Sequence, residues 1–480
     1  MQARPNILFI CTDQQRYDAL GCYGNEHIIT PSIDQLAMEG VLFERCYVQS
    51  PVCASARASL FTGRYPSAHG VWANGVALPP HEQLFTQALA GSGYDCGLVG
   101  KLHLAAAFGG RTETRLDHGF RFWRWAHDPY HDAPGNQYHR WLEARYPELY
   151  AAVQAPEGNV RFETLPVEAH YSHWVAEETI AFLQSARDPT KPFFLMANFF
   201  DPHHPFGAPP AYLQQYDPAR LPRPIEARNE LESKPPILTE ASHESYAGHA
   251  PGFTTYSSGE IQELVATYYA MVTLIDDEVK RILTTLDELG LRDETLVVFT
   301  SDHGEMLGDH NLLLKGPMMY EGAVRVPLIL RWPGHLAEAT RYADLVQWID
   351  LCPTIMEVAN LPPLPRNQAE SLLPLIRGEE RAFQRDWALC MYRNSGHPYD
   401  PPVHSTMLRY DQYKLVVYHG PPATRRARAG ELYDLEADPL EVVNLWDDPH
   451  HSALRSELEA LLLDVFVAIE DRTQPREAYW

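Results

Sequence analysis

Residues 6–16 read NILFICTDQQR, and this stretch indicates the fold class. Its first part is mainly apolar and lacks alternation, which is typical of a strand buried on both faces of a parallel sheet. The run then ends in polar residues, among them Asp13 and Gln14. Open α/β sheets bind their ligands beyond the carboxyl ends of their strands, so we expect a site at this point.

The chain continues with alternating strand-like and helix-like segments. Apolar or β-branched runs at 41–49, 95–99, 193–200, 295–300 and 325–332 predict further strands. Amphipathic stretches between them predict covering helices, among them one at 168–186 and the strongest from Gly259 to Leu289. We therefore predict an α/β fold, a large and mostly parallel sheet between helices, in a catalytic domain spanning residues 1–374. Residues 375–480 change to strand and turn followed by one helix, which predicts a smaller C-terminal α+β subdomain.

Two long segments interrupt this alternation. Residues 105–165 have little periodicity and are rich in Trp, Tyr, His and Arg, which predicts either part of a substrate mouth or an ordinary aromatic surface. A Pro-rich stretch ending near Phe253 is too long for a simple connection and predicts a lid or an interface segment. With the aromatic tail ending in Trp480, this stretch points to a homo-oligomer.

Residues 51–70 read PVCASARASLFTGRYPSAHG and place Cys53 between a strand and a short helix predicted for residues 54–61. Unpaired backbone N–H groups and the helix dipole favour an anion at such a helix start. Arg57 lies one turn further on and can reach back toward the same point. Taken alone, a cysteine here would more often be a buried structural residue.

Composition restricts the partners and the compartment. The 480 residues are 45% hydrophobic and 21% charged, and the formal net charge of -24 argues against nucleic acid and anionic membranes. The seven Cys contain no Cys-x-x-Cys pair, as expected in a reducing cytoplasm. Met1 to Pro5 lead straight into the first strand without a signal-peptide pattern, and the apolar runs are too short to cross a bilayer. We expect a cytoplasmic enzyme with no membrane partner.

A second acid-rich strand end adds to the predicted site. Asp302 and His303 follow the strand at 295–300, as Asp13 and Gln14 follow the first. In a parallel sheet such ends lie on one edge, so these side chains and the Cys53 turn converge. Carboxylate and amide oxygens suit one Ca²⁺, Mg²⁺ or Mn²⁺, and the imidazole of His303 favours Mn²⁺ somewhat.

The motif around Cys53 resembles the signature of the sulfatase family, part of the alkaline-phosphatase superfamily. The matching elements are Cys53-x-x-x-Arg57, Thr62-Gly63-Arg64 and His69-Gly70. The family has Pro or Ala where Ser55 stands and often Ser where Ala56 stands. Further family motifs recur in order along nearly the whole chain. The resemblance implies that the C-terminal subdomain is an antiparallel sheet with one packed helix.

The resemblance also implies the cofactors. In sulfatases the Cys is oxidised to formylglycine, so Cys53 would be the substrate of a formylglycine-generating enzyme and the precursor of the nucleophile. One divalent ion would be bound by Asp13, Gln14, Cys53, Asp302 and His303. Many members have a second Asp at Gln14 and an Asn at His303, so this site carries less negative charge.

Further catalytic residues follow from the same resemblance. Arg57 and His69 would orient and activate the residue derived from Cys53. Lys101 and His103 match the family's Gly-Lys-x-His element, and His203 matches the His of its Pro-His-x-Pro element. Lys315 matches a Lys that follows the metal-binding Asp. These residues would hold the sulfate oxygens, with His203 or Lys315 protonating the leaving oxygen, and Asn74 would add a hydrogen bond. Singly, each Lys would be read as solvent-facing and His103 as a satisfied core residue.

Three functions remain open. The first is hydrolysis of small anionic sulfate monoesters, as in arylsulfatases, because a sulfate monoanion needs one metal and lysines. The second is a phosphonate monoester or phosphodiester hydrolase of the same architecture, which shares Asp-Gln, Asp-His and Asn-Gly but has Tyr and Thr at Lys101 and His103. The third is a metal-binding protein without turnover, if Ser55 prevents conversion of Cys53.

Overall fold

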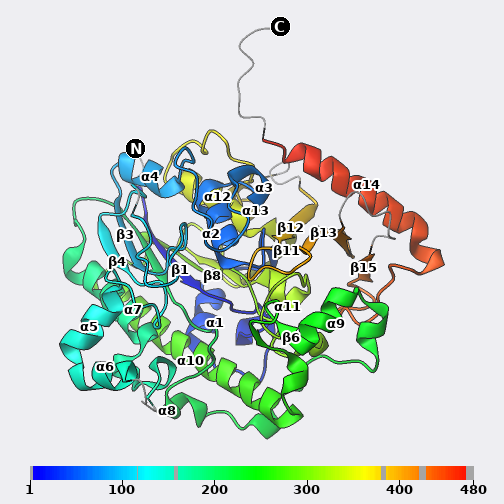
Figure 1. Cartoon of the computed structure of the whole chain (residues 1–480). Helices are drawn as coiled ribbons and strands as arrows, with labels where there is room; N and C mark the ends of the chain where they lie inside the picture. The colour runs from blue at the N-terminus through cyan, green and yellow to red at the C-terminus, as the bar shows by residue number, and fades with distance from the viewer. Residues whose placement is uncertain (1–3, 116, 156–159, 380–384, 421–428, 472–480) are drawn as a thin grey trace.

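The computed structural model describes residues 4–471, apart from residues 116, 156–159, 380–384 and 421–428. A large sheet forms the centre of the molecule, with helices on both of its faces and a separate small sheet toward the C-terminus (Figure 1). The large sheet is mostly parallel and the small one is antiparallel. This arrangement confirms the predicted α/β fold class.

Neighbouring strands of the large sheet come from distant parts of the chain. Their order is β11 (Thr340–Gln347), β2 (Val41–Tyr47), β10 (Leu328–Arg331), β8 (Thr295–Ser301), β1 (Asn6–Thr12), β5 (Phe193–Asn198), β3 (Asp95–Gly100) and β4 (Phe122–Trp125), with β9 (Arg325–Val326) paired to β2. Among these strands, β10 and β9 run antiparallel to their partners. The carboxyl ends of β1, β2, β3, β5 and β8 therefore lie on one edge.

Strand β1 shows why its sequence lacks alternation. Ile7 and Phe9 pack in the core on one face of the sheet, whereas Leu8 and Ile10 pack in the core on the other. Because helices cover both faces, every side chain of the strand is buried and no polar face remains.

The two helical layers are formed by separate sets of helices (Figure 1). The layer on the Leu8 face contains α1 (Pro31–Met38), α5 (Gln137–Arg145), α6 (Pro147–Gln154), α7 (Tyr171–Ala181), α8 (Pro210–Leu213) and α10 (Ser258–Glu288). The opposite layer contains α2 (Cys53–Thr62), α3 (Pro66–His69), α4 (Phe85–Gly91), α9 (Pro236–His243), α11 (Glu321–Val324), α12 (Leu351–Val358) and α13 (Leu373–Ile376). None of the described helices is long and apolar enough to cross a bilayer.

Two local predictions differ from the structure. Residues 105–165, read as aperiodic, contain β4 at the edge of the large sheet as well as α5 and α6. The β4 sequence FWRW is too short and only half-buried, so it shows no period. The helix predicted for 168–186 begins at Tyr171 and ends in a π turn over Phe182–Ala186.

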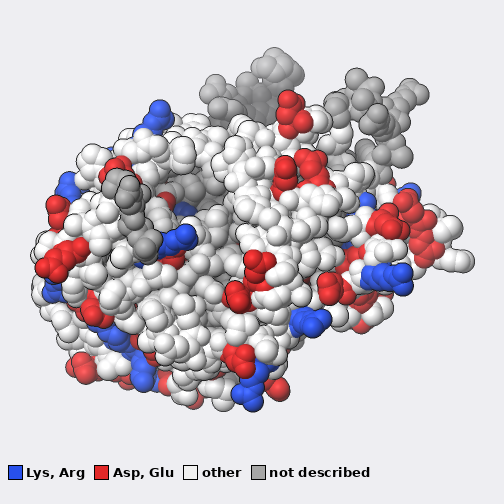
Figure 2. All heavy atoms as spheres, turned by 60° about the horizontal axis from the view of Figure 1, so that its bottom comes forward, with Lys and Arg blue, Asp and Glu red and all other residues white. Residues whose placement is uncertain are grey.

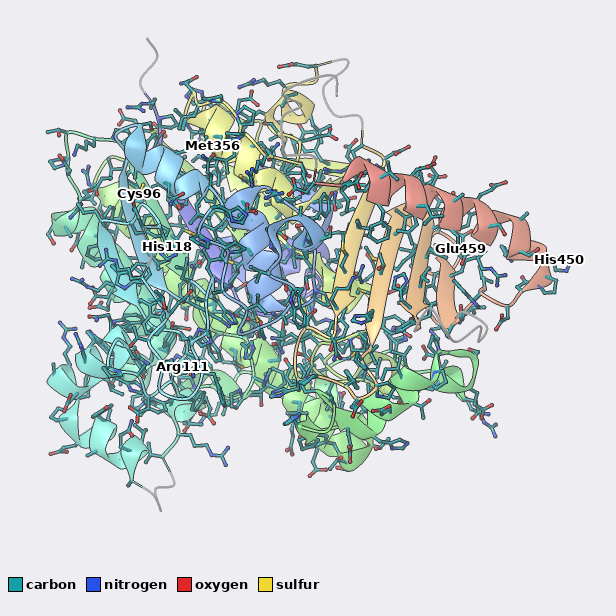
Figure 3. All side chains as sticks on the ribbon, turned by 45° about the horizontal axis from the view of Figure 1, so that its top comes forward. Cys96, Arg111, His118, Met356, His450 and Glu459 are labelled. Atoms are coloured by element: carbon teal, nitrogen blue, oxygen red, sulfur yellow. The ribbon has the colours of Figure 1, made fainter. Side chains whose placement is uncertain are left out.

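The small sheet is a meander of β12 (Trp387–Arg393), β13 (His404–Tyr410), β14 (Tyr413–His419) and β15 (Ala429–Asp434). Helix α14 (Ser452–Ala468) runs across it, with His450 just before its start and Glu459 along its length (Figure 3). The domain boundary at 374/375 stays a prediction, and the tail ending in Trp480 lies outside the described residues.

The surface charge is finely mixed. Among the described residues on the face drawn in Figure 2, Lys and Arg occur in small groups between Asp and Glu. A mixed surface of this kind, on a chain with net charge -24, offers no broad basic area on that face.

A buried ion-pair network joins the small sheet to the large one. The Lys414 ammonium on β14 lies 2.7 Å from Glu321 Oε1 and 2.7 Å from Glu441 Oε1, and its side chain is 0% exposed. Glu321 begins α11, directly after the loop that carries Lys315. The C-terminal strands are therefore held against this loop by charges that have little access to water.

We expect Lys414→Met to lower the free energy of unfolding by about 3–5 kcal/mol, because it leaves two carboxylates buried without their cation. Urea denaturation followed by circular dichroism measures this change. Arg377→Met is the matched control, since the exposed Arg377–Glu357 pair should contribute under ~1 kcal/mol. Equal losses in the two variants would contradict a structural role for the Lys414 network.

Candidate active site

The predicted site lies at the carboxyl edge of the large sheet. Asp13 and Gln14 follow β1, and Asp302 and His303 follow the adjacent strand β8. Strand β2 is separated from β8 by the antiparallel β10, so its end is not next to the other two. Cys53 reaches the site because it is the first residue of α2, beyond the end of β2.

Four of the predicted metal ligands form one buried cluster. Asp13, Cys53, Asp302 and His303 each offer one ligand atom within 4.8 Å of the others. The Cys53 sulfur lies 3.0 Å from His303 Nε2 and 3.6 Å from Asp13 Oδ1. His303 Nε2 lies 3.6 Å from Asp13 Oδ1 and 3.7 Å from Asp302 Oδ1. These atoms thus surround a single point.

The orientation of the His303 ring suits metal binding. Its Nδ1 lies 2.9 Å from the Gly304 carbonyl, which can only accept, so Nδ1 carries the proton. The lone pair is then on Nε2, which faces the two carboxylates and the sulfur. Two carboxylate oxygens, one imidazole nitrogen and the position-53 side chain form a donor set that fits one divalent cation.

Gln14 lies beside this cluster, with a left-handed backbone (φ 67°). Its Oε1 accepts a hydrogen bond of 2.5 Å from Lys315 Nζ. Its Nε2 donates to the Glu305 carboxylate and lies 3.2 Å from His204 Nδ1. The amide oxygen is therefore aimed at the same side of the site as the cluster, where Lys315 now binds it.

Two cations neutralise the outer carboxylate oxygens. The Arg57 guanidinium donates to Asp302 Oδ2 at 2.8 Å and to Asp13 Oδ2 at 3.4 Å, and Lys101 Nζ lies 2.6 Å from Asp13 Oδ2. Burial alone would raise the pKa of Asp13, but Lys101 and Arg57 hold it well below its usual range. The Asp13 carboxylate therefore stays ionised, and the Oδ1 atoms of both acids are left facing the cluster.

The position-53 side chain lies in a positive field. Lys315 Nζ is 3.4 Å from the Cys53 sulfur. Burial and Asp13 raise the pKa of the Cys53 thiol, yet Lys101, Lys315 and His303 outweigh them and lower it. At the next residue, the Ala54 N–H donates to Asn74 Oδ1 at 3.2 Å, so Asn74 contacts the first turn of α2. The helix start and the two lysines together favour negative charge here.

The predicted histidines 103 and 203 flank Lys101. The His103 ring lies edge-on to His127, 4.5 Å away, and its Nδ1 is buried without a hydrogen-bond partner among the described residues. The His203 ring lies 4.8 Å from Phe200, over which Lys101 Nζ is 5.5 Å from the ring centre. Burial lowers the pKa of both imidazoles well below the usual value, so both are neutral in the free protein near pH 7.

His69 lies behind helix α2. Its Nε2 is 3.0 Å from Ser59 Oγ, and its Nδ1 accepts from the Val71 N–H at 3.1 Å. Burial, with the nearby Arg64, lowers the pKa of His69 to about 3, so the ring is neutral. These bonds attach His69 to the body of α2, and a role in orienting position 53 would act through that helix.

Glu305 is a buried site residue that the sequence analysis missed. Its Oε1 accepts from the Leu314 and Leu307 N–H groups at 2.5 and 3.0 Å, while Oε2 accepts from Gln14. It thus holds the Gln14 amide and closes the loop that ends at Lys315. Four non-glycine residues of this loop have left-handed backbones, namely Leu307, His310, Asn311 and Leu314. Such strain persists only where surrounding contacts hold it, and the signal was an acid directly after Asp302-His303-Gly304.

The Pro-rich segment supports the same loop from outside. Glu230 Oε1 lies 2.6 Å from His310 Nδ1, and Lys234 Nζ lies 3.1 Å from Glu230 Oε1. The side chains of Glu230 and Lys234 are both 0% exposed. This part of the segment predicted as a lid or interface is therefore built into the protein interior.

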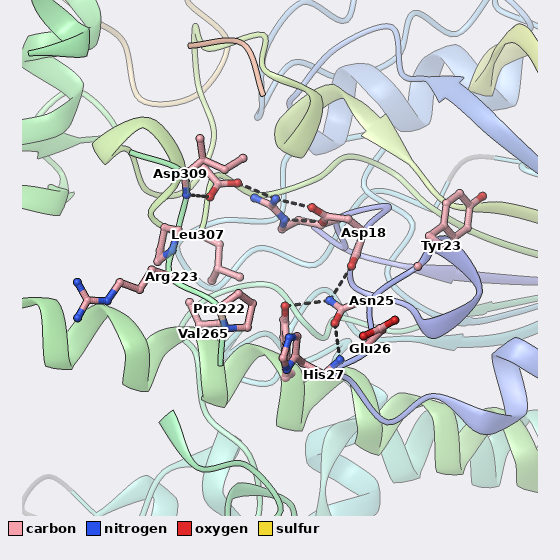
Figure 4. A pocket seen from close by; sticks show the side chains of 15 residues that line it. Asp18, Tyr23, Asn25, Glu26, His27, Pro222, Arg223, Val265, Leu307 and Asp309 are labelled. Atoms are coloured by element: carbon pink, nitrogen blue, oxygen red, sulfur yellow. Dashed lines mark hydrogen bonds and ion pairs between the residues drawn. The ribbon is translucent and has the colours of Figure 1, made fainter. Parts of the chain in front are cut away.

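A separate cavity of about 400 Å³ lies beside the site, on the far side of Arg16 (Figure 4). The Arg16 guanidinium is bound by Asp18 and Asp309, each at 2.7 Å. Asn25 joins the Asp18 carbonyl to the Tyr269 hydroxyl along its wall. None of the predicted site residues lines this cavity, so the chemistry described above does not extend into it.

The fold and this cluster define a class of protein. The sheet is mostly parallel, and its strand ends bring two carboxylates, an imidazole and the position-53 side chain together between lysines. This arrangement resembles the architecture of the alkaline-phosphatase superfamily. Within it, the site is that of an enzyme that hydrolyses anionic esters.

The family follows from comparison of sequences. The family model described as Sulfatase matches residues 5–361, and the model described as N-sulphoglucosamine sulphohydrolase, C-terminal, matches residues 308–467. The chain therefore belongs to the sulfatase family and is a sulfuric ester hydrolase.

Relatives of known name support this assignment over the full length. The chain is 31% identical to the uncharacterised sulfatase YidJ of Escherichia coli strain K12, over 98% of this chain and 88% of YidJ. It is 30% identical to the multifunctional alkaline phosphatase superfamily protein PehA of Trinickia caryophylli, over 98% of this chain and 96% of PehA. The crystal structure of the phosphonate monoester hydrolase of Agrobacterium radiobacter superposes with a TM-score of 0.82 and 27% identity, covering 98% and 97% of the two chains.

We expect Glu305→Gln to lower metal affinity or kcat/KM by roughly 10- to 100-fold, because the new amide cannot accept all three N–H groups. Titration with Mn²⁺ followed by calorimetry, and steady-state kinetics, measure the two quantities. Glu226→Gln, in the exposed part of the Pro-rich segment, serves as the control and should change neither. Unchanged metal affinity and kinetics in Glu305→Gln would exclude the positioning role.

Proposed function

We propose that the protein hydrolyses sulfate monoesters, using formylglycine derived from Cys53 and one divalent cation. The observation that carries this proposal is the buried cluster of Asp13, Cys53, Asp302 and His303 with Lys315 3.4 Å from the sulfur. Chemistry at position 53 needs a cation on one side and an anion site on the other. The cluster supplies ligands for the first, and the lysines supply the second.

Each side chain around the cluster has its own proposed role in the reaction. Lys101 and Lys315 would hold the oxygens of the ester, whose single negative charge suits two ammonium groups. Arg57 would hold both carboxylates in place, as its hydrogen bonds to Asp13 and Asp302 support. Lys315, or His203 after taking up a proton, would protonate the leaving oxygen. His103 would add a hydrogen bond from the opposite side, and Asn74 would steady the start of α2.

Asp13, Gln14, Asp302, His303 and position 53 would hold the cation. When bound, a divalent ion would supply Lewis-acid activation of the formylglycine and neutralise charge on the ester. The oxygen ligands suit Ca²⁺ or Mg²⁺, and the His303 nitrogen favours Mn²⁺.

A phosphonate monoester hydrolase activity is the second candidate. Gln14 beside the cluster and His303 in it, in place of a second Asp and an Asn, favour this activity, as does the structural likeness to the Agrobacterium radiobacter enzyme. Lys101 and His103 favour sulfate, because the resemblance gives phosphonate monoester hydrolases Tyr and Thr at these two positions. The third alternative, a binder without turnover, would apply if Cys53 is not converted.

We also propose a cytoplasmic location and maturation by a formylglycine-generating enzyme. The seven cysteines are free, and all but Cys22 are buried, which agrees with a reducing compartment. Self-association stays a prediction.

We expect Cys53→Ala to reduce turnover of an aryl sulfate by roughly 10⁴-fold or more, because the nucleophile is lost. Metal content, measured by plasma mass spectrometry, should stay near that of the parent, since four other ligands remain. Cys22→Ala is the control and should retain full turnover. Peptide mass spectrometry at position 53 shows whether the parent carries formylglycine, and full activity with a plain thiol would refute the proposal.

A substrate panel separates the two hydrolase functions. On metal-quantified protein, we expect kcat/KM for 4-nitrophenyl sulfate to exceed that for a phenylphosphonate monoester and for a phosphodiester. Lys101→Met should reduce the sulfate value by roughly 10²-fold, through loss of a charged contact to the transition state. A phosphonate value that is larger by a wide margin would replace the first function with the second.

A further inference from the structure

A continuous row of rings leads from the site to the surface. It starts at buried Phe200, after β5, and ends at two exposed imidazoles. Its successive ring centres are 4.8, 4.1, 5.3, 5.7 and 4.0 Å apart. The members of this ring row, in order, are Phe200, His203, His204, Tyr246, His397 and His249.

The inner end of the ring row touches the predicted machinery. Lys101 Nζ lies over the Phe200 ring, and His204 Nδ1 is 3.2 Å from Gln14 Nε2. Burial raises the pKa of the Tyr246 phenol, and the nearby charges of Cys53 and Glu305 raise it further. The phenol therefore lies within the field of position 53.

The outer half is assembled from two segments that are remote in sequence. Tyr246 and His249 belong to the turn between β6 (Glu244–Ser245) and β7 (Ala250–Pro251) of the Pro-rich segment. His397 belongs to the loop between β12 and β13 of the small sheet. The His397 ring contacts those of Tyr246 and His249, and these contacts join the two segments.

The turn that presents Tyr246 is strained. Tyr246, Ala247 and Gly248 have consecutive left-handed backbones, with φ of 51°, 53° and 83°. For the two non-glycine residues this backbone conformation is unfavourable. Packing a tyrosine ring into the core would not require such a turn. Here the turn places the half-buried Tyr246 ring between the rings of His204 and His397.

We propose that the ring row is the wall that receives the leaving group, and that this group is a planar, uncharged aromatic ring. The row consists of Phe, Tyr and His side chains and becomes more exposed outward. Flat rings stack favourably on such a surface, while a polyanionic saccharide would need cations along the same path. The inference rests on the proposed function, because it assigns the alcohol side of the same ester.

The ring row is tested by comparing KM for an aryl ester and an alkyl ester of the same acid. If the enzyme hydrolyses sulfate esters, the pair is 4-nitrophenyl sulfate and ethyl sulfate. If it hydrolyses phosphonate esters, the pair is the 4-nitrophenyl and ethyl esters of phenylphosphonate. We expect Tyr246→Ala and His397→Ala each to raise KM for the aryl ester by about 3- to 10-fold, and KM for the alkyl ester by less than about 2-fold. Tyr246→Phe should behave as the parent, since it keeps the ring.

Two further measurements separate this inference from its alternatives. Calorimetric binding of both esters to Cys53→Ala should show the same aryl preference without turnover. Tyr256→Ala, just beyond the Pro-rich segment and outside the row, should leave both KM values unchanged. Equal effects on aryl and alkyl esters, or none, would overturn the ring-row inference even if sulfate is hydrolysed. A failure of sulfate esters alone, with aryl preference kept among phosphonates, would instead refute the proposed function.

Discussion

The structure depends on neutralising two carboxylates that have no contact with water. Asp13 and Asp302 are both 0% exposed, and Arg57, 1% exposed, donates to each of them. An unpaired charge at this depth would cost several kcal/mol, so the guanidinium must lie between the two acids in the folded state. This requirement fixes helix α2 against the ends of β1 and β8, and thereby brings Cys53 into the cluster.

The same pairing gives each carboxylate two separate functions. The Oδ2 atoms of both acids bind Arg57, and that of Asp13 also binds Lys101, while the Oδ1 atoms face His303 and the position-53 side chain. With Lys315 included, three basic side chains face two acids before any metal charge is added. The site is thus suited both to one cation and to an anionic ester beside it.

The peripheral segments hold this arrangement in place. The loop from residue 303 to 315 contains several left-handed residues, and buried Glu305 and Glu230 bind it from within and from outside. The Lys414 network attaches the small sheet behind it. The loop around His397, between two strands of the small sheet, contacts the strained turn at Tyr246. The small sheet therefore contributes to the surroundings of the site as well as to stability.

The sequence by itself determined the α/β class, the strands that end in Asp13 and Asp302, the helix start at Cys53 and the family. These are local signals, since unbroken apolar runs, a terminating Gly63 and short motifs depend on neighbouring residues. Only the tertiary structure decided that β10 separates β2 from β8, that Glu305 orients Gln14, and that His69 bonds to the back of α2. Such contacts join residues far apart in the chain, and their distances depend on how strands and loops pack rather than on any local pattern.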